Sequence, residues 1–322
     1  MFSKLKQTLM LVSIFLFGYQ SQSQSAMNEI AEFGSNPGNL KMFQYQPKEL
    51  GKKTPLVVVL HGCIQNAEEI AQLTGWNKLA DENQFMMIYP QQNPANNPQN
   101  CFNWFLPEDI VKNKGEAASI KQMIDYAIDK NNVDVDRIFV AGVSAGGAIT
   151  AAMMALYPET FKAGAIMSGI PYGAATDLMT GLSAMQGNTK KTGQEWSDLV
   201  KEQNPLYEGG YPSIAVFHGN DDPAVKVINA EEIVKQWTSV HQLDTVPITI
   251  QRFSNNDDVT AYFYGKRENK QKVIRYSINN LGHALAIDPG ENIKQGGTIS
   301  KYAIDKDFHS SYWAAKFFEL VE

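Results

Sequence analysis

Residues 137–156 read Arg-Ile-Phe-Val-Ala-Gly-Val-Ser-Ala-Gly-Gly-Ala-Ile-Thr-Ala-Ala-Met-Met-Ala-Leu, and they decide the fold. Residues 137–141 favour a strand, and residues 148–156 favour a helix. The pattern Gly-x-Ser-x-Gly lies between them, and its glycines let the chain pass closely around a serine in strained backbone geometry. We therefore expect a sharp strand-to-helix turn, a nucleophile elbow, that exposes the Ser144 hydroxyl above the edge of a sheet.

Strands and helices alternate on both sides of this turn. We expect edge strands within 28–53, strands at 56–60, 85–89, 163–168, 213–218, 247–253, 260–264 and 272–278, and helices at 67–83, 116–129, 229–241 and 310–320. This alternation predicts an α/β fold with a mostly parallel central sheet flanked by helices. We expect one domain over residues 26–322, because α/β folds often exceed 200 residues undivided.

Residues 172–211 form a long polar segment with little strand character. Insertions above the carboxyl ends of strands often form lids, so this segment is a candidate for one. The alternative is a helical decoration of the surface.

The N-terminus has the composition of a secretory signal peptide. Two lysines precede the apolar residues 9–17, and the small and polar residues 21–26 follow. A membrane anchor is the alternative, but about nine apolar residues fall far short of the roughly 20 that span a bilayer. We expect residues 1–25 to be removed and the mature chain to be secreted, extracellular or periplasmic, without a membrane anchor.

Composition excludes several classes of protein. Hydrophobic residues make up 43% of the chain and charged residues 19%, as in a globular protein with a sizeable core. A net charge of −6 argues against a nucleic-acid partner. We find no phosphate-binding loop, no dinucleotide-binding glycine pattern and no metal-ligand spacing, so we expect no cofactor and no metal. The oligomeric state stays open.

Cys63 and Cys101 are the two cysteines of the chain. An exported protein matures where disulfides form, so we expect a bridge between them. Closing this loop would stabilise the fold by roughly 3–4 kcal/mol. The alternative is two free, buried cysteines.

A serine hydroxyl needs a general base, and His283 is our candidate among five histidines. It follows the last expected strand and a short turn, so it lies on a loop at a strand's carboxyl end and after the serine in chain order. The alternative is a surface histidine without a role. The other four stand at an early loop, a strand end, a helix and a helix start: His61, His218, His241 and His309.

The acid that orients the base should follow an earlier strand, and residues 218–225 supply two candidates, Asp221 and Asp222. The negative oxygen of a tetrahedral intermediate also needs backbone donors. We expect these to be the N–H of Ala145 and one from the His61-Gly62-Cys63 loop, with Cys63 favoured.

With these segments in hand, the chain resembles the poly(3-hydroxybutyrate) depolymerase-type esterases, a secreted α/β-hydrolase family that includes feruloyl and acetylxylan esterases. The matching runs are Leu-His-Gly-Cys at 60–63, Tyr-Pro-Gln at 89–91, Cys-Phe-Asn-Trp-Phe at 101–105, Gly-Val-Ser-Ala-Gly-Gly at 142–147 and Gly-His-Ala at 282–284. The resemblance implies an α/β-hydrolase fold with Ser144, Asp222 and His283 as catalytic triad. It favours Asp222 through the form His-Gly-x-x-Asp-x-x-Val, and it supports Cys63 as oxyanion donor.

The resemblance also bears on the substrate pocket. Leu285 stands where the family often has a tryptophan that helps to form an acyl or aryl pocket. Trp104 and Phe105 are further pocket candidates, with packing under a loop as the alternative.

These features predict an exported serine esterase that acts on carboxylic esters through an acyl-enzyme. Feruloyl or acetyl esters on plant polysaccharide are the first expected substrates, and poly(3-hydroxyalkanoate) or its oligomers are the second. A non-catalytic binding protein on a hydrolase fold is the remote alternative.

Overall fold

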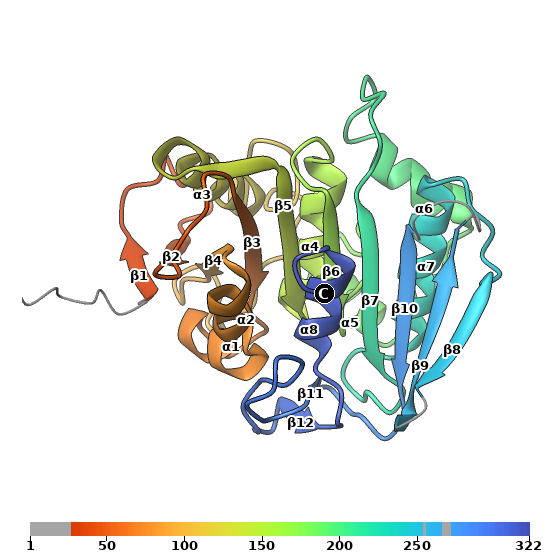
Figure 1. Ribbon diagram of the computed structural model, residues 1–322. Helices are drawn as coiled ribbons and strands as arrows, with labels where there is room; N and C mark the ends of the chain where they lie inside the picture. Colours follow the sequence, from red (N-terminus) through yellow and green to blue (C-terminus); the bar gives the residue numbers. More distant parts are fainter. Residues whose placement is uncertain (1–26, 254–255, 266–271) are drawn as a thin grey trace, which may run out of the picture.

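A ten-stranded sheet forms the centre of the computed structural model, which describes residues 27–253, 256–265 and 272–322 (Figure 1). Its strand order is β1-β2-β4-β3-β5-β6-β7-β10-β9-β8. The strands are β1 Met27–Ile30, β2 Lys41–Tyr45, β3 Thr54–Leu60, β4 Met86–Gln91, β5 Val133–Val143, β6 Ala163–Met167, β7 Ser213–Gly219, β8 Thr249–Phe253, β9 Asn256–Tyr264 and β10 Val273–Ile278. The signal peptide expected at 1–25 lies outside the described residues.

The six central strands, from β4 to β10, pair in parallel, and both edges of the sheet are antiparallel. Parallel strands need crossover helices, which cover both faces of the sheet. The helices are α1 Ala67–Thr74, α2 Trp76–Asn83, α3 Gly115–Lys130, α4 Ala145–Leu156, α5 Leu178–Met185, α6 Gly193–Lys201, α7 Ile228–Val240 and α8 Ser310–Phe317. The predicted α/β fold with a mostly parallel sheet is confirmed.

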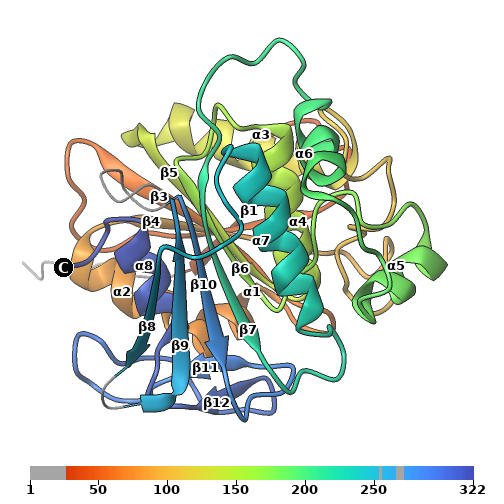
Figure 2. The same ribbon diagram turned by 90° about the vertical axis from the view of Figure 1, so that its right-hand side faces the viewer.

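Two apolar cores lie on opposite faces of the sheet. All of β3 is buried, with Leu56, Val58 and Leu60 packing in the core beneath α3, α4 and α7, and Val57 and Val59 packing beneath α1, α2 and α8. Figure 2 shows α4 and α7 on one side of the sheet and α8 on the other. A strand buried on both faces has to be apolar at every position, as this one is.

The helix expected over 67–83 is two helices. Gly75 separates them in the left-handed conformation, with φ 68°, and its N–H caps α1 by donating to Ala71 O. A Cβ at residue 75 would lie 2.6 Å from Gly297 N, so this close approach of two backbones also requires glycine. The contact is made by a segment more than 200 residues away, which local sequence patterns do not reveal.

The 172–211 segment contains α5 and α6. Trp196 on α6 is fully buried and its Nε1–H donates to Glu232 on α7 at 2.6 Å, which fixes α6 against the helical layer. Its role as a lid stays a prediction.

A second, two-stranded sheet of β11 Leu285–Ile287 and β12 Ala303–Asp305 lies at the carboxyl ends of the parallel strands (Figure 1). Within the described parts of the chain, every helix is too short or too polar to cross a bilayer.

Candidate active site

Ser144 occupies the turn between β5 and α4 in strained backbone geometry, with φ 56° and ψ −119°. Its N–H donates to Met167 O on the neighbouring strand at 2.9 Å, which fixes the turn against the sheet. A non-glycine residue with positive φ costs free energy, and such strain persists where the surroundings determine the conformation. The turn thereby holds the hydroxyl at the carboxyl edge of the sheet and at the N-terminus of α4.

The two glycines of the motif are required by packing. A Cβ at residue 142 would lie 2.3 Å from Gly146 O, and a Cβ at residue 146 would lie 2.3 Å from Leu60 O and 2.5 Å from His61 O. These three oxygens are backbone atoms, which have little freedom to move aside. The Gly-x-Ser-x-Gly pattern therefore lets α4 begin in contact with the end of β3.

His283 lies beside Ser144, on the loop that follows β10. Its Nε2 atom is 2.9 Å from Ser144 Oγ, and its Nδ1 atom is 2.7 Å from Asp222 Oδ2. With Nδ1–H donating to the carboxylate, Nε2 is free to accept the serine proton. The structure thus brings together the serine, the histidine and the second of the two aspartate candidates from loops up to 139 residues apart.

Asp222 is held in one orientation by several donors. Its side chain has no exposed surface, and Oδ1 accepts from the N–H groups of Ala224 and Val225 at 2.9 and 2.8 Å. Burial raises the pKa of Asp222, but hydrogen bonds from His218 and His283, with the charge of His283, outweigh it and hold the pKa well below its usual range. The carboxylate is therefore ionised and able to stabilise an imidazolium.

Asp221, the other acid candidate, has an exposed side chain, and its backbone N–H donates to Leu281 O at 3.1 Å. It does not take part in the contacts between Asp222 and His283 described above.

His218 is a member of the site that sequence reasoning did not assign. Its Nε2 atom lies 2.8 Å from Val225 O and 3.5 Å from Asp222 Oδ2, and the residue is buried. From the end of β7 it thus contacts the loop that carries Asp222. The run His-Gly-x-x-Asp-x-x-Val could have identified this residue, because its first residue, His218, contacts the carbonyl oxygen of its last, Val225.

The remaining histidines have structural partners. Each places a ring nitrogen near a backbone carbonyl: His61 near Gly62 O, His241 near Pro212 O and His309 near Thr74 O.

The loop after β3 lies against Ser144 and carries the expected oxyanion donor. A Cβ at residue 62 would lie 3.5 Å from Ser144 Cβ. Among the hydrogen bonds of the described residues, neither the N–H of Cys63 nor that of Ala145 donates to a protein acceptor. Both donors are thus available to a negative oxygen beside the serine.

His61 anchors this loop from below. Its Nδ1–H donates to Gly62 O at 2.7 Å, and Nε2 accepts from Gln92 N at 3.0 Å, so both ring nitrogens are used. Burial lowers the pKa of His61 to about 4, against the raising effect of the Gly62 hydrogen bond. The ring is therefore neutral at pH 7, in the tautomer that both contacts require.

The expected disulfide is present: Cys63 is bridged to Cys101. The Cys101 end is held in turn by a buried polar network, in which Gln92 Nε2 donates to Cys101 O at 2.9 Å and to Glu116 Oε1. Asn103 N donates to the second Glu116 oxygen at 2.9 Å. The bridge therefore joins the loop after β3, which carries Cys63, to a segment that is fixed on α3.

Glu116 is 1% exposed at the start of α3. Burial, helped by the charge of nearby Asp109, raises the pKa of Glu116 to about 8, although hydrogen bonds from Gln92 and Asn103 oppose the shift. At neutral pH this carboxyl is mostly protonated, because these hydrogen bonds offset only part of the cost of burying its charge.

A cavity of about 240 Å³ opens beside Ser144, and we call it the reaction cavity. Its lining residues are Gly62, Cys63, Ile64, Gln65, Gln99, Cys101, Val143, Ser144, Ser168, His283, Ala284 and Tyr302.

The three sequence-based pocket candidates do not line this cavity. Trp104 is 8% exposed, and it packs with Phe105 against α5, where a Cβ at residue 181 would lie 3.0 Å from Phe105 Cβ. Leu285 is 3% exposed in the core on the α8 side of the sheet. These apolar side chains pack against neighbouring elements, Phe105 partly buried and the other two buried, and Tyr302 is the aromatic residue that lines the cavity instead.

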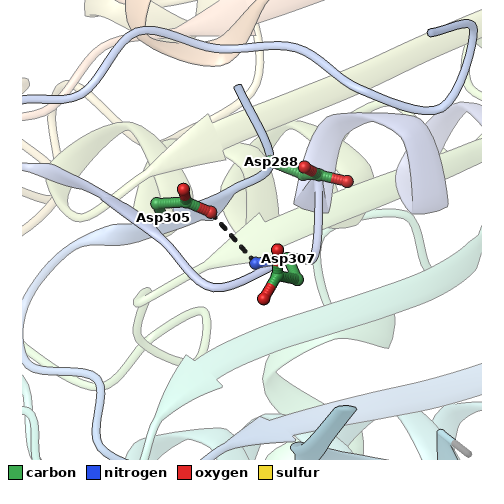
Figure 3. A group of neighbouring side chains, drawn as sticks. All are labelled: Asp288, Asp305 and Asp307. Carbon is green, nitrogen blue, oxygen red and sulfur yellow. Dashed lines mark hydrogen bonds between the residues drawn. The ribbon is translucent and has the colours of Figure 1, made fainter. Parts of the chain in front are cut away.

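One acidic group in the described part of the chain has its oxygens close enough together to suit a cation. It comprises Asp288, Asp305 and Asp307 near β11 and β12 (Figure 3). Asp305 accepts from the N–H of Asp307 at 3.1 Å, and Asp288 accepts from Gln295 at 2.9 Å, so internal hydrogen bonds use part of the group. We assign no metal to it.

Comparison with known proteins identifies the family of the chain. The sequence profile of the family described as "Esterase PHB depolymerase" matches residues 42–249. The chain belongs to this family. Poly(3-hydroxyalkanoate) depolymerase C of Paucimonas lemoignei is 36% identical over 98% of the chain and 76% of the relative. Feruloyl esterase B of Thermothelomyces thermophilus is 34% identical over 67% of the chain and 75% of the relative.

A solved structure supports the fold of this esterase. The acetyl xylan esterase from Aspergillus awamori superposes with a TM-score of 0.78 at 21% identity, over 92% of the chain and 100% of that structure. The expected α/β-hydrolase fold is therefore confirmed, and the chain is a hydrolase of an esterase family.

Proposed function

We propose that the chain is an exported serine esterase in which Ser144, His283 and Asp222 form the catalytic triad. Ser144 Oγ attacks the carbonyl carbon of an ester while His283 Nε2 takes its proton. The tetrahedral intermediate expels the alcohol, which receives that proton, and an acyl-serine remains. Water then attacks the acyl-serine with His283 again as base, and the acid leaves with the serine restored.

The observation that carries this proposal is the continuous contact from Ser144 Oγ through the imidazole to Asp222, at 2.9 and 2.7 Å. The N–H groups of Cys63 and Ala145 serve as oxyanion donors in the proposal. Each such donor contributes about 3–4 kcal/mol to stabilisation of the transition state. Asp222 keeps the imidazole in the tautomer that accepts the serine proton.

Two observations favour aliphatic hydroxyacyl esters, the poly(3-hydroxyalkanoate) type or its oligomers, as substrates. The lining of the reaction cavity includes the aliphatic side chains of Ile64, Val143 and Ala284. The relative that matches 98% of the chain is named a poly(3-hydroxyalkanoate) depolymerase.

Feruloyl or acetyl esters on plant polysaccharide, the first expectation from the sequence, are the second candidate. The relatives named feruloyl esterase B and acetylxylan esterase, at 34% and 31% identity, favour them. Side-by-side assays with methyl ferulate, acetylated xylan and a 3-hydroxybutyrate trimer separate the two candidates by kcat/KM.

Export of the mature chain, with residues 1–25 removed, is part of the proposal. The signal-like N-terminus supports it, and the Cys63–Cys101 bridge fits an oxidising compartment. N-terminal sequencing of protein recovered outside the cytoplasm tests it.

Turnover of p-nitrophenyl butyrate tests the chemistry. We expect Ser144→Ala to lower kcat by at least about 10³-fold while the circular dichroism spectrum stays unchanged. A variant with the wild-type rate would overturn the assignment of the nucleophile.

A further inference from the structure

A second hollow opens beside the reaction cavity, and we call it the distal groove. Its volume is about 370 Å³, and it shares the lining residues Ile64, Gln65 and Tyr302 with the reaction cavity, so the two hollows adjoin. Its lining residues are Ile64, Gln65, Glu69, Gln72, Leu73, Thr298, Ile299, Ser300, Lys301 and Tyr302. One wall therefore comes from the loop before α1 and from α1 itself, and the other from residues 298–302.

The two walls are fixed to each other. Lys78 on α2 donates from Nζ to the carbonyl oxygens of Gly290, Asn292 and Gln295 at 2.9–3.1 Å. The backbones at Gly75 and Gly297 approach so closely that a Cβ on the first would lie 2.6 Å from the nitrogen of the second. The groove is thus a built part of the fold, because these contacts join the segment just after the first wall to the segment just before the second.

The lining suits an uncharged, partly apolar chain. Ile64 and Ile299 are 48% and 63% exposed and line the groove together, and Leu73 adds a third aliphatic surface. The groove holds one acid and one base, Glu69 and Lys301, so its formal charges balance.

Neutral hydrogen-bonding groups alternate with these aliphatic surfaces, from two glutamine amides and two hydroxyls, at Gln65, Gln72, Thr298 and Ser300. Lys301 Nζ lies 4.7 Å from the centre of the Tyr302 ring. A cation over this ring competes with the stacking of a sugar on that face, so the lining favours an aliphatic chain over a glycan.

We propose that the distal groove binds the hydroxyacyl unit next to the reacting ester of an aliphatic oligoester. This inference rests on the proposed function, because it takes Ser144 as the point of attack. The branched aliphatic side chains contact the alkyl groups of that unit, and the glutamine amides donate to its ester carbonyls. One wall, residues 298–302, lies outside the 42–249 range that the family profile matches.

The test compares substrates of increasing length. For the mature protein we expect kcat/KM to rise from the methyl ester of 3-hydroxybutyrate to its linear dimer and trimer, mainly through KM. Ile299→Gln should lower the ratio of kcat/KM for the trimer to kcat/KM for p-nitrophenyl butyrate about five- to tenfold, because it removes apolar contact with the distal unit. Val135→Gln is the matched control, because Val135 is 56% exposed on β5 and lines neither hollow. Its kcat/KM for the trimer and for p-nitrophenyl butyrate should both equal the wild-type values.

Three results would overturn the inference. One is a trimer-to-butyrate ratio that Ile299→Gln leaves unchanged, and another is an equal loss on both substrates. The third is a loss confined to acetylated xylo-oligosaccharide, which would assign the groove to a glycan. Failure of the proposed function has a different signature, namely p-nitrophenyl butyrate turnover that survives Ser144→Ala.

Discussion

His218 Nε2 lies 3.5 Å from Asp222 Oδ2, the same carboxylate oxygen that accepts the hydrogen bond from His283. The other oxygen of Asp222 accepts from two backbone N–H groups. Both oxygens are therefore occupied by donors in a site without exposed carboxylate surface. This arrangement keeps the acid ionised and fixed in one rotamer, so that its interaction with His283 is preorganised.

Asp222→Asn should lower kcat for p-nitrophenyl butyrate about 10³- to 10⁴-fold, because an amide leaves the imidazole in the wrong tautomer and gives no charge to stabilise its protonated form. The neighbouring Asp221→Asn is the matched control, since its side chain is exposed, and its rate should stay within about twofold of wild type. Equal losses in the two variants would contradict the assignment of the acid.

Gly146→Ala should destabilise the fold by at least about 3 kcal/mol, because its Cβ would meet the carbonyl oxygens of Leu60 and His61. Gly210→Ala, with no atom within 4 Å of the new Cβ, should change the free energy of unfolding by less than about 0.5 kcal/mol. Urea denaturation of both variants measures the difference. A stable Gly146→Ala protein would show that the elbow tolerates a wider separation of α4 from β3.

Removal of the Cys63–Cys101 bridge should cost about 3–4 kcal/mol of stability, since it closes a loop of 38 residues. The double variant Cys63→Ser/Cys101→Ser is the appropriate protein, because a single change leaves a free thiol. Its kcat should fall as well, because Cys63 carries a proposed oxyanion donor whose position the bridge fixes. Thermal unfolding with and without reductant checks the first effect, and the reductant should not shift the midpoint of the double variant.

The raised pKa of the buried Glu116 carboxyl should make the stability of the fold depend on pH. Its pKa rises from about 4.5 in the unfolded chain to about 8 in the fold, so the folded state keeps a proton that the unfolded chain has lost between these values. Its contribution to the free energy of unfolding is therefore complete below pH 4.5, falls as the pH rises, and is lost above pH 8, by up to about 5 kcal/mol. Glu116→Gln keeps a neutral side chain of the same shape and should remove this slope.

Urea denaturation of wild type and Glu116→Gln at pH 5, 6, 7, 8 and 9 measures the effect. We expect the wild type to lose stability relative to the variant between pH 5 and 8, with no further relative change at pH 9. Parallel profiles would show that Glu116 is ionised throughout this range. Glu116→Ala, which also removes the hydrogen bonds to Gln92 and Asn103, should be less stable than both at every pH.

The parts of the site that the sequence predicts well are those fixed by local chemistry or by chain order. The turn at Ser144 has a local cause, since residues 142 and 146 have to be glycine for α4 to start against β3. His283 follows from its place after the last parallel strand. The acid needed the resemblance to a family as well, because Asp221 and Asp222 are adjacent and only burial distinguishes them.

The remaining features depend on contacts between distant segments. Trp104 and Phe105 are aromatic residues of the kind that line pockets, yet they pack against α5 and neither lines the reaction cavity. Residues 288–302 are polar and irregular, so no periodicity predicts that Tyr302 lines the reaction cavity or that Ile299 lines a groove. The break at Gly75 likewise depends on Gly297, which no local signal connects to it.

The proposed nucleophile, acid, base and one oxyanion donor come from the loops that follow four different parallel strands, β5, β7, β10 and β3 respectively. The sheet holds the reacting atoms, whereas the segments that decide what enters the cavity lie outside it. Those segments can therefore change in length or sequence during evolution while the proposed catalytic residues keep their positions. Such a division of labour accounts for one family whose members carry names as different as polyester depolymerase, feruloyl esterase and acetylxylan esterase.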